Sequence, residues 1–359
     1  MTYTTTKVQN PTNNNSHVPV EITKKKKNTK LAMASSSSSS PLRVGFVPEH
    51  FSTPIHFARK HYGLDAELIP FPSGTGHMIT ALRSGEIDVG IGLTEGWVAG
   101  LGKVENQGSE EGDGGDDGGY RLVGTYVETP LCWAVSTGAG RPEIQSLDSL
   151  KGGKVGVSRI GSGSYVMSYV LADQRNWLLP TAGAAGASES TGAPFSDFVA
   201  LDTFERLRRA VNDGTADFFM WEHFTSKRYY DNGEIRKVGE IYTPWSSWKI
   251  VASTRLLPQQ QRSAKNGSVD ERVEDLLDRL NKGIKHFNEN HDEAVGYIST
   301  ELDYSEEDAR EWLKTVRFPE ATQGVDLEVV KTTVDVLKKS GVLKLSGGMK
   351  PEEMIAKRR

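Results

Sequence analysis

Two short stretches of this chain repeat one pattern, and this repeat constrains the fold more than any other feature. The turn Ser73-Gly74-Thr75-Gly76 is matched by Ser162-Gly163-Ser164. Downstream of each turn lies a matching segment, residues 81–88 and 210–217, that predicts a helix end, a turn glycine and an aspartate leading into a buried strand. Because each half opens a helix with small hydroxyl and glycine residues, the repeat predicts two similar lobes that face each other across a ligand-binding cleft.

The order of the predicted elements indicates an α/β fold. Strands alternate with helices in a βαβαβ pattern, which is typical of a mostly parallel sheet covered by helices, and the pattern starts again after Leu147. The predicted strands are 43–47, 66–71, 88–93, 121–128, 131–136, 154–158, 198–201, 216–221, 236–241 and 248–253. The predicted helices are 54–61, 76–83, 162–173, 204–212, 223–231, 269–290, 292–300, 305–315 and 327–340.

These elements divide the chain into four predicted parts. They are a disordered tail (1–41), the first part of lobe 1 (42–133), lobe 2 (134–246) and a return to lobe 1 with C-terminal helices (247–359). Two strand segments, near 132–135 and 247–251, are predicted to cross between the lobes. Two crossovers make a hinge, and hinge closure over a ligand is an established mode of conformational switching.

The first 41 residues form a tail rich in lysine and serine. They hold six lysines and one acid, and they end in the serine run 35–40. Such a stretch cannot bury enough apolar area to offset the entropy of ordering it, so we predict that it is disordered. The lysine run 24–27 leaves a nuclear or membrane-surface address open as an alternative, and Met33 leaves open a translation start later than Met1.

Two further regions interrupt the element pattern. Residues 102–119 are rich in glycine and acids, but the acids lack the spacing of an EF-hand calcium loop. We therefore interpret this region as a disordered surface insertion. Residues 181–192 form a second insertion of small residues.

Charge and cysteine content exclude several classes of function. The chain holds 43 basic and 47 acidic residues, and six of the lysines lie in the tail, so the body is acidic. This argues against a nucleic-acid partner, because phosphate neutralisation needs a basic surface. No stretch approaches the roughly 18 consecutive apolar residues that span a bilayer, so no membrane partner is expected. The single cysteine, Cys132, excludes an intramolecular disulfide, and we expect a cytoplasmic protein.

The two repeated turns are candidate anion sites. A helix N-terminus leaves main-chain N–H groups unpaired and carries a partial positive charge, and glycine lets a ligand approach the backbone. Serine and threonine add hydroxyl groups, so the combination suits a carboxylate, phosphate or sulfonate. The alternative is an ordinary helix cap, because serine and threonine are favoured there in any case.

Seven aromatic residues follow predicted strand ends or lie in loops. Ligands of open α/β sheets bind outside the carboxyl ends of the strands, where flat rings could enclose a planar heterocycle. The alternative is core packing, which accounts for most buried tryptophans. We expect about half to line the cleft, with Trp97 and Trp221 the strongest candidates. The seven are Phe51, Trp97, Tyr165, Trp221, Phe224, Trp245 and Trp248.

Two carboxylates and one histidine complete the candidate site. Glu95 and Glu222 occupy equivalent places after the repeated strands, where each could accept a hydrogen bond from a ring amino group or cap the next helix. His50 follows a strand and is the histidine most suited to touch a ligand. The nearby His56 and His61 stand five residues apart, about 140° around a helix, so they do not share a face and no metal site is predicted.

Searches for catalytic signatures find none. The chain has no GxSxG elbow, no P-loop and no phosphate-type GxGxxG after its first strand, so no catalytic residue and no cofactor is assigned. Cys132 lies inside an apolar strand, where a thiol is usually an inert small hydrophobe.

Five runs of this sequence resemble type II periplasmic binding proteins. The resemblance covers roughly residues 42–350 and is similar to a fungal branch related to nitrate-, sulfonate- and thiamine-pyrimidine-precursor binders. It implies a two-lobe Venus-flytrap fold with two crossover hinge segments. The runs are Val44–Phe51, Ser73–Gly76, Gly85–Val89, Ser158–Ser164 and Met220–Phe224. The cleft positions that the resemblance implies are His50, Phe51, Ser73, Gly74, Thr75, Thr94, Glu95, Ser162, Gly163, Ser164, Trp221 and Glu222.

The chain departs from this family in two ways. Bacterial members carry an export signal and feed a membrane transporter, and the first 41 residues here do not have the pattern of such a signal. Fungal pyrimidine synthases of the fold carry a cysteine-rich motif, whereas Cys132 stands alone.

These observations lead to one main hypothesis and two alternatives. We expect a soluble protein of undetermined oligomeric state that clamps a small anionic or heterocyclic metabolite, with a thiamine-pathway compound as the specific candidate, and does not convert it. One alternative is an enzyme of pyrimidine or thiamine-precursor biosynthesis that uses His50 or another cleft group. The other is a scaffold that binds partners through its basic tail.

Overall fold

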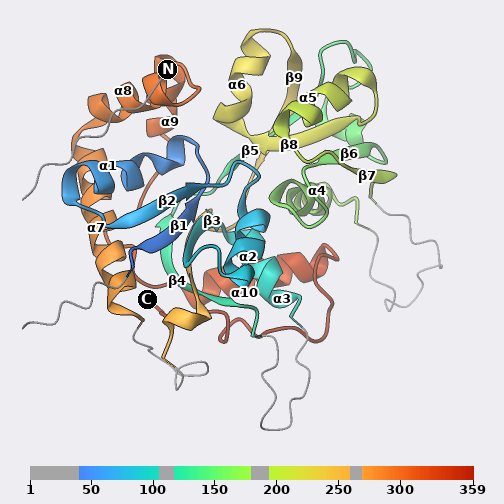
Figure 1. Ribbon diagram of the computed structural model, residues 1–359. Helices are drawn as coiled ribbons and strands as arrows, with labels where there is room; N and C mark the ends of the chain where they lie inside the picture. The colour runs from blue at the N-terminus through green and yellow to red at the C-terminus, as the bar shows by residue number, and fades with distance from the viewer. Residues whose placement is uncertain (1–39, 105–116, 179–193, 259–268) are drawn as a thin grey trace, which may run out of the picture. The chain divides into compact units, whose positions relative to one another are not determined.

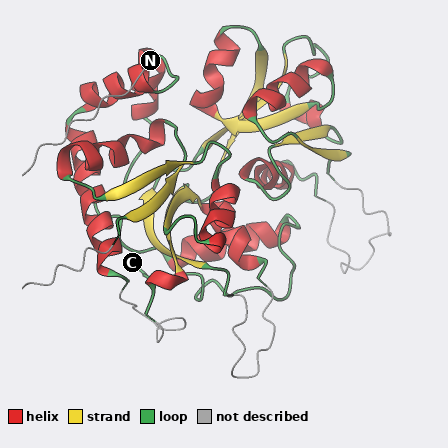
Figure 2. Ribbon diagram, viewed as in Figure 1, coloured by secondary structure: helices red, strands yellow, loops and turns green. Residues whose placement is uncertain are grey.

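The computed structural model describes residues 40–104, 117–178, 194–258 and 269–359 (Figure 1). Residues 1–39 of the predicted disordered tail, most of the acidic insertion and the small-residue insertion lie outside these residues. Residues Pro41–Arg359 form one compact unit by their contacts. Within it, helices flank the strands of two separate sheets (Figure 2).

The first sheet has five strands in the order β2-β1-β3-β10-β4. Its strands are β1 (Leu42–Phe46), β2 (Ala66–Pro70), β3 (Val89–Leu93), β4 (Tyr120–Val127) and β10 (Trp248–Ser253). β1 runs parallel to β2 and β3, whereas β10 runs antiparallel to β3 and β4. The C-terminal segment covers the β4 edge, since Leu122 N donates to Met354 O and Ala356 N donates to Leu122 O.

The second sheet repeats this plan in the order β7-β6-β8-β5-β9. Its strands are β5 (Cys132–Gly138), β6 (Lys154–Val157), β7 (Asp197–Ala200), β8 (Phe218–Glu222) and β9 (Ile235–Tyr242). β6 runs parallel to β7 and β8, and β5 runs antiparallel to β8 and β9. In both sheets the fourth strand enters from the other lobe, so the sequence repeat corresponds to a repeated topology.

The repeated aspartates have the same structural task in both lobes. Asp88 Oδ2 accepts the main-chain N–H of Arg43 at 3.0 Å, and Asp217 Oδ2 accepts that of Lys154 at 2.7 Å. Each aspartate also pairs with an arginine, Arg43 or Arg141. Because Arg43 lies in β1 and Lys154 begins β6, each aspartate fixes the central strand that follows it, β3 or β8, against its parallel neighbour, β1 or β6.

The helices follow the predicted positions within a few residues, with one addition. They are α1 (Thr53–Tyr62), α2 (Thr75–Ser84), α3 (Thr94–Gly102), α4 (Gly163–Gln174), α5 (Phe204–Asp213), α6 (His223–Asp231), α7 (Glu271–Glu289), α8 (His291–Glu301), α9 (Glu306–Leu313) and α10 (Leu327–Lys339). α3 was not predicted, because three glycines give it weak helix propensity. Tertiary packing explains why glycines stand in this helix. A Cβ at Gly96 would lie 2.8 Å from Thr75 Cγ2, and a Cβ at Gly100 would overlap the Tyr120 hydroxyl.

Two short segments cross between the sheets, at residues 128–131 and 243–247. They are joined to each other, since Ser247 Oγ donates to Thr129 O at 2.7 Å and Leu131 N donates to Thr243 Oγ1 at 2.9 Å. The first crossover therefore precedes the predicted segment 132–135, whose residues lie wholly inside β5. The second crossover, residues 243–247, precedes β10, whereas most of the predicted segment 247–251 lies inside that strand.

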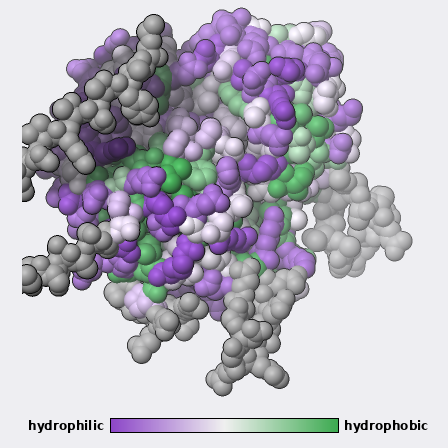
Figure 3. Space-filling view, in the orientation of Figure 1, coloured by the Kyte–Doolittle hydropathy of each residue, from purple (hydrophilic) through white to green (hydrophobic). Residues whose placement is uncertain are grey.

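The surface that faces the viewer in Figure 3 is mostly hydrophilic, and apolar side chains appear on it as separate patches. Among the described residues, no helix is long and apolar enough to cross a membrane.

Candidate ligand-binding cleft

A cavity lies between the two lobes and is lined by residues of both. The volume of this cavity is about 80 Å³, which suits a compact ligand. The lining residues of the first lobe are Val47, Glu49, Pro72, Ser73, Gly74, Thr75, Gly76, Ile79, Leu93, Gly96 and Trp248. Those of the first crossover and the second lobe are Leu131, Trp133, Ser158, Arg159, Gly161, Ser162, Gly163, Ser164, Trp221 and Glu222. Both predicted glycine turns, together with Trp221 and Glu222, therefore line one cavity.

The first turn opens helix α2 toward the cavity. Gly74 is the N-cap residue and has a φ of 77°, a backbone conformation that residues other than glycine rarely adopt. Thr75 is buried, and its Oγ1 accepts the N–H of Leu93 at 2.9 Å. The threonine hydroxyl therefore holds the turn against the end of β3. The main-chain N–H groups of the first turn remain the natural anion donors.

The second turn opens helix α4 in a similar way. Ser162 is the N-cap, and its Oγ accepts the N–H of Tyr165 at 3.4 Å. Its Oγ also lies 3.0 Å from Ser164 Oγ, which in turn accepts the N–H of Ser158 at 3.2 Å. The helix-cap interpretation is thus realised at Ser162. The same serine lines the cavity, so capping and exposure to a ligand occur together.

Arg159 connects the two turns and was not predicted as a site residue. It follows β6, is half-buried, and its Nη1 donates to Ser73 O at 2.7 Å across the cleft. A Cβ at Gly76 would overlap its guanidinium, so the glycine is required for this approach. Burial lowers the pKa of Arg159 from its ordinary value, but a guanidinium stays charged in proteins. The signal in the sequence was a lone cation two residues before a Gly-Ser-Gly turn.

Two carboxylic acids line the cavity as well. Burial, together with the nearby charge of Glu222, raises the pKa of Glu49 to about 8. Burial raises the pKa of Glu222 to about 7, although main-chain hydrogen bonds oppose the shift. Glu222 also caps α6, because its Oε2 accepts the N–H of Thr225 at 2.6 Å. Near neutral pH, each carboxyl group can therefore either donate or accept a hydrogen bond.

The counterpart Glu95 does not line the cavity, nor does Thr94. Glu95 is fully buried and its Oε2 accepts Trp245 Nε1 at 3.0 Å. Thr94 Oγ1 donates to Ser246 O at 2.6 Å. Both residues therefore attach the start of α3 to the second crossover. The predicted ligand contact is corrected to a place at the hinge, because the fold brings residues 243–247 against this helix start.

His50 and Phe51 lie behind the cleft wall. The imidazole of His50 is buried among Phe51, Tyr304 and Trp312, with ring centroids 4.3–4.5 Å away. Its Nε2 lies 3.9 Å from Glu222 Oε1, and burial holds its pKa well below the ordinary value, so it is neutral. Phe51 stacks on Trp248 and lines a second cavity. Neither residue lines the cleft, in contrast to the prediction.

Trp97 belongs to the core. Its side chain is fully buried, packs edge-on against Tyr120, and lies over Gly90 and Gly92 of β3, where a Cβ would come within 3.0 Å of the indole. This corrects the prediction that Trp97 lines the cleft. The aromatic residues that do line it are Trp133, Trp221 and Trp248. Trp133 had not been considered, because it sits within a strand rather than at a strand end.

The histidines near the N-terminus have different partners. His56 stacks on Tyr297 of α8 with centroids 3.9 Å apart, and His77 contacts Phe71 edge-on. His61 contacts the same helix as His56, through Glu293, and its surroundings are described below.

Two sheets of equal strand order, joined by two crossovers around a cleft, define the periplasmic-binding-protein fold. Solved structures share it: the alkanesulfonate-binding protein SsuA of Xanthomonas axonopodis pv. citri, bound to MOPS, is 16% identical, with a TM-score of 0.61 over 88% of this chain and 98% of that chain. The aliphatic sulphonate binding protein SsuA of Escherichia coli is also 16% identical, with a TM-score of 0.60 over 89% and 92%.

A more similar structure defines the family. The CA3427 gene product of Candida albicans is 40% identical, covers 85% of this chain and 92% of its own, and has a TM-score of 0.70. The family model for Ca3427-like periplasmic binding proteins matches residues 133–241. The chain therefore belongs to the Ca3427-like family of periplasmic-binding-protein-fold proteins. Comparison with curated protein sequences gives no significant match.

Proposed function

We propose that this protein clamps a small metabolite between its lobes and releases it unchanged. The observation that carries the proposal is that one cavity is lined by two kinds of group. The first kind is the starts of α2 and α4 with the guanidinium of Arg159, which suit an anionic group. The second kind is the carboxyl groups of Glu49 and Glu222 with the indole rings of three tryptophans.

The carboxyl groups and indole rings suit a flat ring that carries N–H groups or acceptor nitrogens. Trp221 is held flat by Phe204, with ring centroids 5.0 Å apart and an interplanar angle of 17°, so it offers a fixed surface for stacking. Trp133 and Trp248 are buried, and their Nε1 donors have no hydrogen-bond partner among the described residues. A ligand that bonded one of these donors would offset the cost of burying it unpaired.

The ligand class follows from this pairing. A compact heterocycle with an anionic substituent satisfies both kinds of group, and a thiamine-pathway pyrimidine precursor is the specific candidate. The sulfonate binders that share the fold support an anionic group. The single cysteine supports the proposal that binding takes place in the cytoplasm.

Native mass spectrometry of the purified protein, before and after denaturation, tests the proposal. We expect a copurified small molecule in the wild type, and its loss in Arg159→Met and Trp221→Ala. Removing a charged hydrogen-bond donor typically costs affinity by roughly tenfold to a hundredfold. Arg175→Met is the matched control, because Arg175 belongs to the same lobe and pairs with Asp148 outside the cleft.

Two outcomes would contradict the proposal. The first is an empty protein whose melting temperature is raised by none of the probes, namely thiamine-pathway pyrimidines, alkanesulfonates and inorganic phosphate. The second is a bound molecule that is consumed on incubation, which would favour an enzyme. In that case Glu49 and Glu222, with pKa values of about 8 and 7, are the candidate acid and base.

A further inference from the structure

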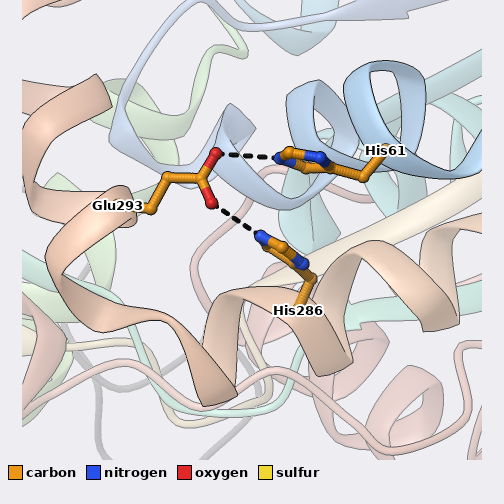
Figure 4. Close-up of side chains that lie close together, drawn as sticks. All are labelled: His61, His286 and Glu293. Carbon is orange, nitrogen blue, oxygen red and sulfur yellow. Dashed lines mark hydrogen bonds and ion pairs between the residues drawn. The ribbon is translucent and has the colours of Figure 1, made fainter.

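We propose that His61, His286 and Glu293 form a zinc-binding site outside the cleft. The three residues come from three helices: His61 from the last turn of α1, His286 from the last turn of α7 and Glu293 from the first turn of α8. Figure 4 shows both imidazole rings directed at the one carboxylate. Residues 225 positions apart in the chain thus meet only because α1 packs along α7.

The donor atoms already converge. His61 Nε2 lies 2.8 Å from Glu293 Oε1, and His286 Nε2 lies 2.7 Å from Glu293 Oε2. The two imidazole rings stack with centroids 4.2 Å apart, and all three ligand atoms lie within 4.8 Å of one another. The side chains are between one-sixth and one-third exposed, so an ion can enter from solvent.

This donor set fits Zn²⁺ better than a hard cation. Two imidazole nitrogens and one carboxylate oxygen are standard zinc ligands, bound at about 2.0–2.2 Å, and Ca²⁺ or Mg²⁺ prefer oxygen alone. Tetrahedral bonds of that length separate two ligand atoms by about 3.3–3.6 Å. Each nitrogen–oxygen pair therefore needs to open by less than 1 Å from its present hydrogen-bond distance. The fourth position faces solvent and would hold water.

Of the two residues next to the site, Tyr62 favours metal binding and Lys60 opposes it. His286 Nδ1 lies 3.1 Å from the Tyr62 hydroxyl, an outer-shell partner that can fix the ring with Nε2 free for a metal. Lys60 Nζ donates to Glu293 Oε1 at 2.8 Å, so its ammonium competes with a cation for that oxygen. The Lys60 side chain is 52% exposed and can swing away.

A second group of possible ligands, Cys132, His223 and Glu240, is less suited to a cation. Lys237 Nζ lies 2.5 Å from Glu240 Oε2 and 3.4 Å from His223 Nδ1, so an ammonium already sits among two of the three ligands. This group serves as the comparison in the test.

The test is isothermal titration of tag-free, chelator-treated full-length protein with ZnCl₂ at pH 7.5, with thermal unfolding in parallel. We expect one zinc ion per chain and a higher melting temperature with zinc. Binding should weaken by roughly tenfold or more in His61→Ala, His286→Ala and Glu293→Gln, because each removes a ligand. His56→Ala is the matched control, since His56 lies on α1 but faces Tyr297.

Lys60→Gln separates a metal site from a hydrogen-bonded cluster. Removing the competing ammonium should tighten zinc binding severalfold, whereas a cluster that only joins the helices would gain no zinc affinity. The proposal is overturned if the wild type binds no zinc at millimolar ZnCl₂, or if Cys132→Ala abolishes binding while Glu293→Gln leaves it unchanged. Glu293→Gln also keeps the test decisive if a histidine variant fails to fold.

Discussion

Gly283 is a position where adding a single methyl group should destabilise the fold. It is buried in α7 where this helix crosses α1. A Cβ built on it would overlap Pro54 O and lie 2.8 Å from Ala58 N and 2.9 Å from Ala58 Cβ. Two of these atoms are backbone, so α1 as a whole would have to move away.

The magnitude of Gly283→Ala is a balance of two effects. Alanine in place of glycine stabilises a helix interior by about 1 kcal/mol. Overpacking costs about 1–3 kcal/mol, and the upper end applies where backbone must shift. We expect a net loss of about 2 kcal/mol. For a chain of this size, that lowers the melting temperature by about 3 °C.

Gly296→Ala is the matched control with the opposite sign. Gly296 lies inside α8, and a Cβ there would meet no atom within 4 Å. We expect this variant to gain about 1 kcal/mol, seen as a melting temperature about 2 °C higher. Differential scanning calorimetry of both variants and the wild type is the assay. A Gly283→Ala protein as stable as the Gly296→Ala protein would refute the packing argument.

Three further predictions follow from the lobes and the cleft. Asp88→Asn and Asp217→Asn should each lower the free energy of unfolding by about 1–2 kcal/mol, and urea titration of the double variant should show the two losses adding, because the sites share no partner. Because the folded-state pKa of Glu49 is raised to about 8, its stabilising contribution is fully present below pH 4.5 and is lost as the pH rises through 8. The free energy of unfolding of the ligand-free wild type should therefore fall across that pH range. Urea titrations at several pH values should show a smaller fall in Glu49→Gln. Trp97→Ala should lower the free energy of unfolding by about 3–5 kcal/mol in urea titration. Trp221→Ala should weaken binding of the copurified ligand by about tenfold and should lower the free energy of unfolding by less than half as much as Trp97→Ala. Equal losses of stability in the two variants would contradict the assignment of Trp97 to the core and Trp221 to the cleft.

The sequence predicted most of the secondary structure, because its signals are local. Alternating βα elements, the glycine that ends α2 and the apolar spacing of α7 all act within a few residues. The missed helix α3 shows the limit of such signals. Its glycines are unfavourable in an isolated helix, and they are explained by side chains that pack against them from other elements, such as Thr75 at Gly96, Tyr120 at Gly100 and Leu343 at Gly102.

In the candidate site, too, the sequence predicted the features that depend on local pattern and missed those that depend on tertiary packing. The glycine turns that line the cleft carry their own chemistry, since a Ser-Gly start to a helix exposes N–H groups in any fold. Three of the predicted cleft residues that do not line the cavity, Thr94, Glu95 and Trp97, lie on α3. Their direction depends on where the second crossover passes, which no local pattern records.

The sequence alone determined that this chain forms two similar α/β lobes, because repeated turns and repeated aspartates encode the same topology twice. Only the tertiary structure decided which side chains meet. Arg159 reaches Ser73, and His61 reaches Glu293, across 86 and 232 positions of the chain. Such contacts depend on how helices and lobes pack against each other, and packing is a property of the whole set of buried surfaces rather than of any one segment.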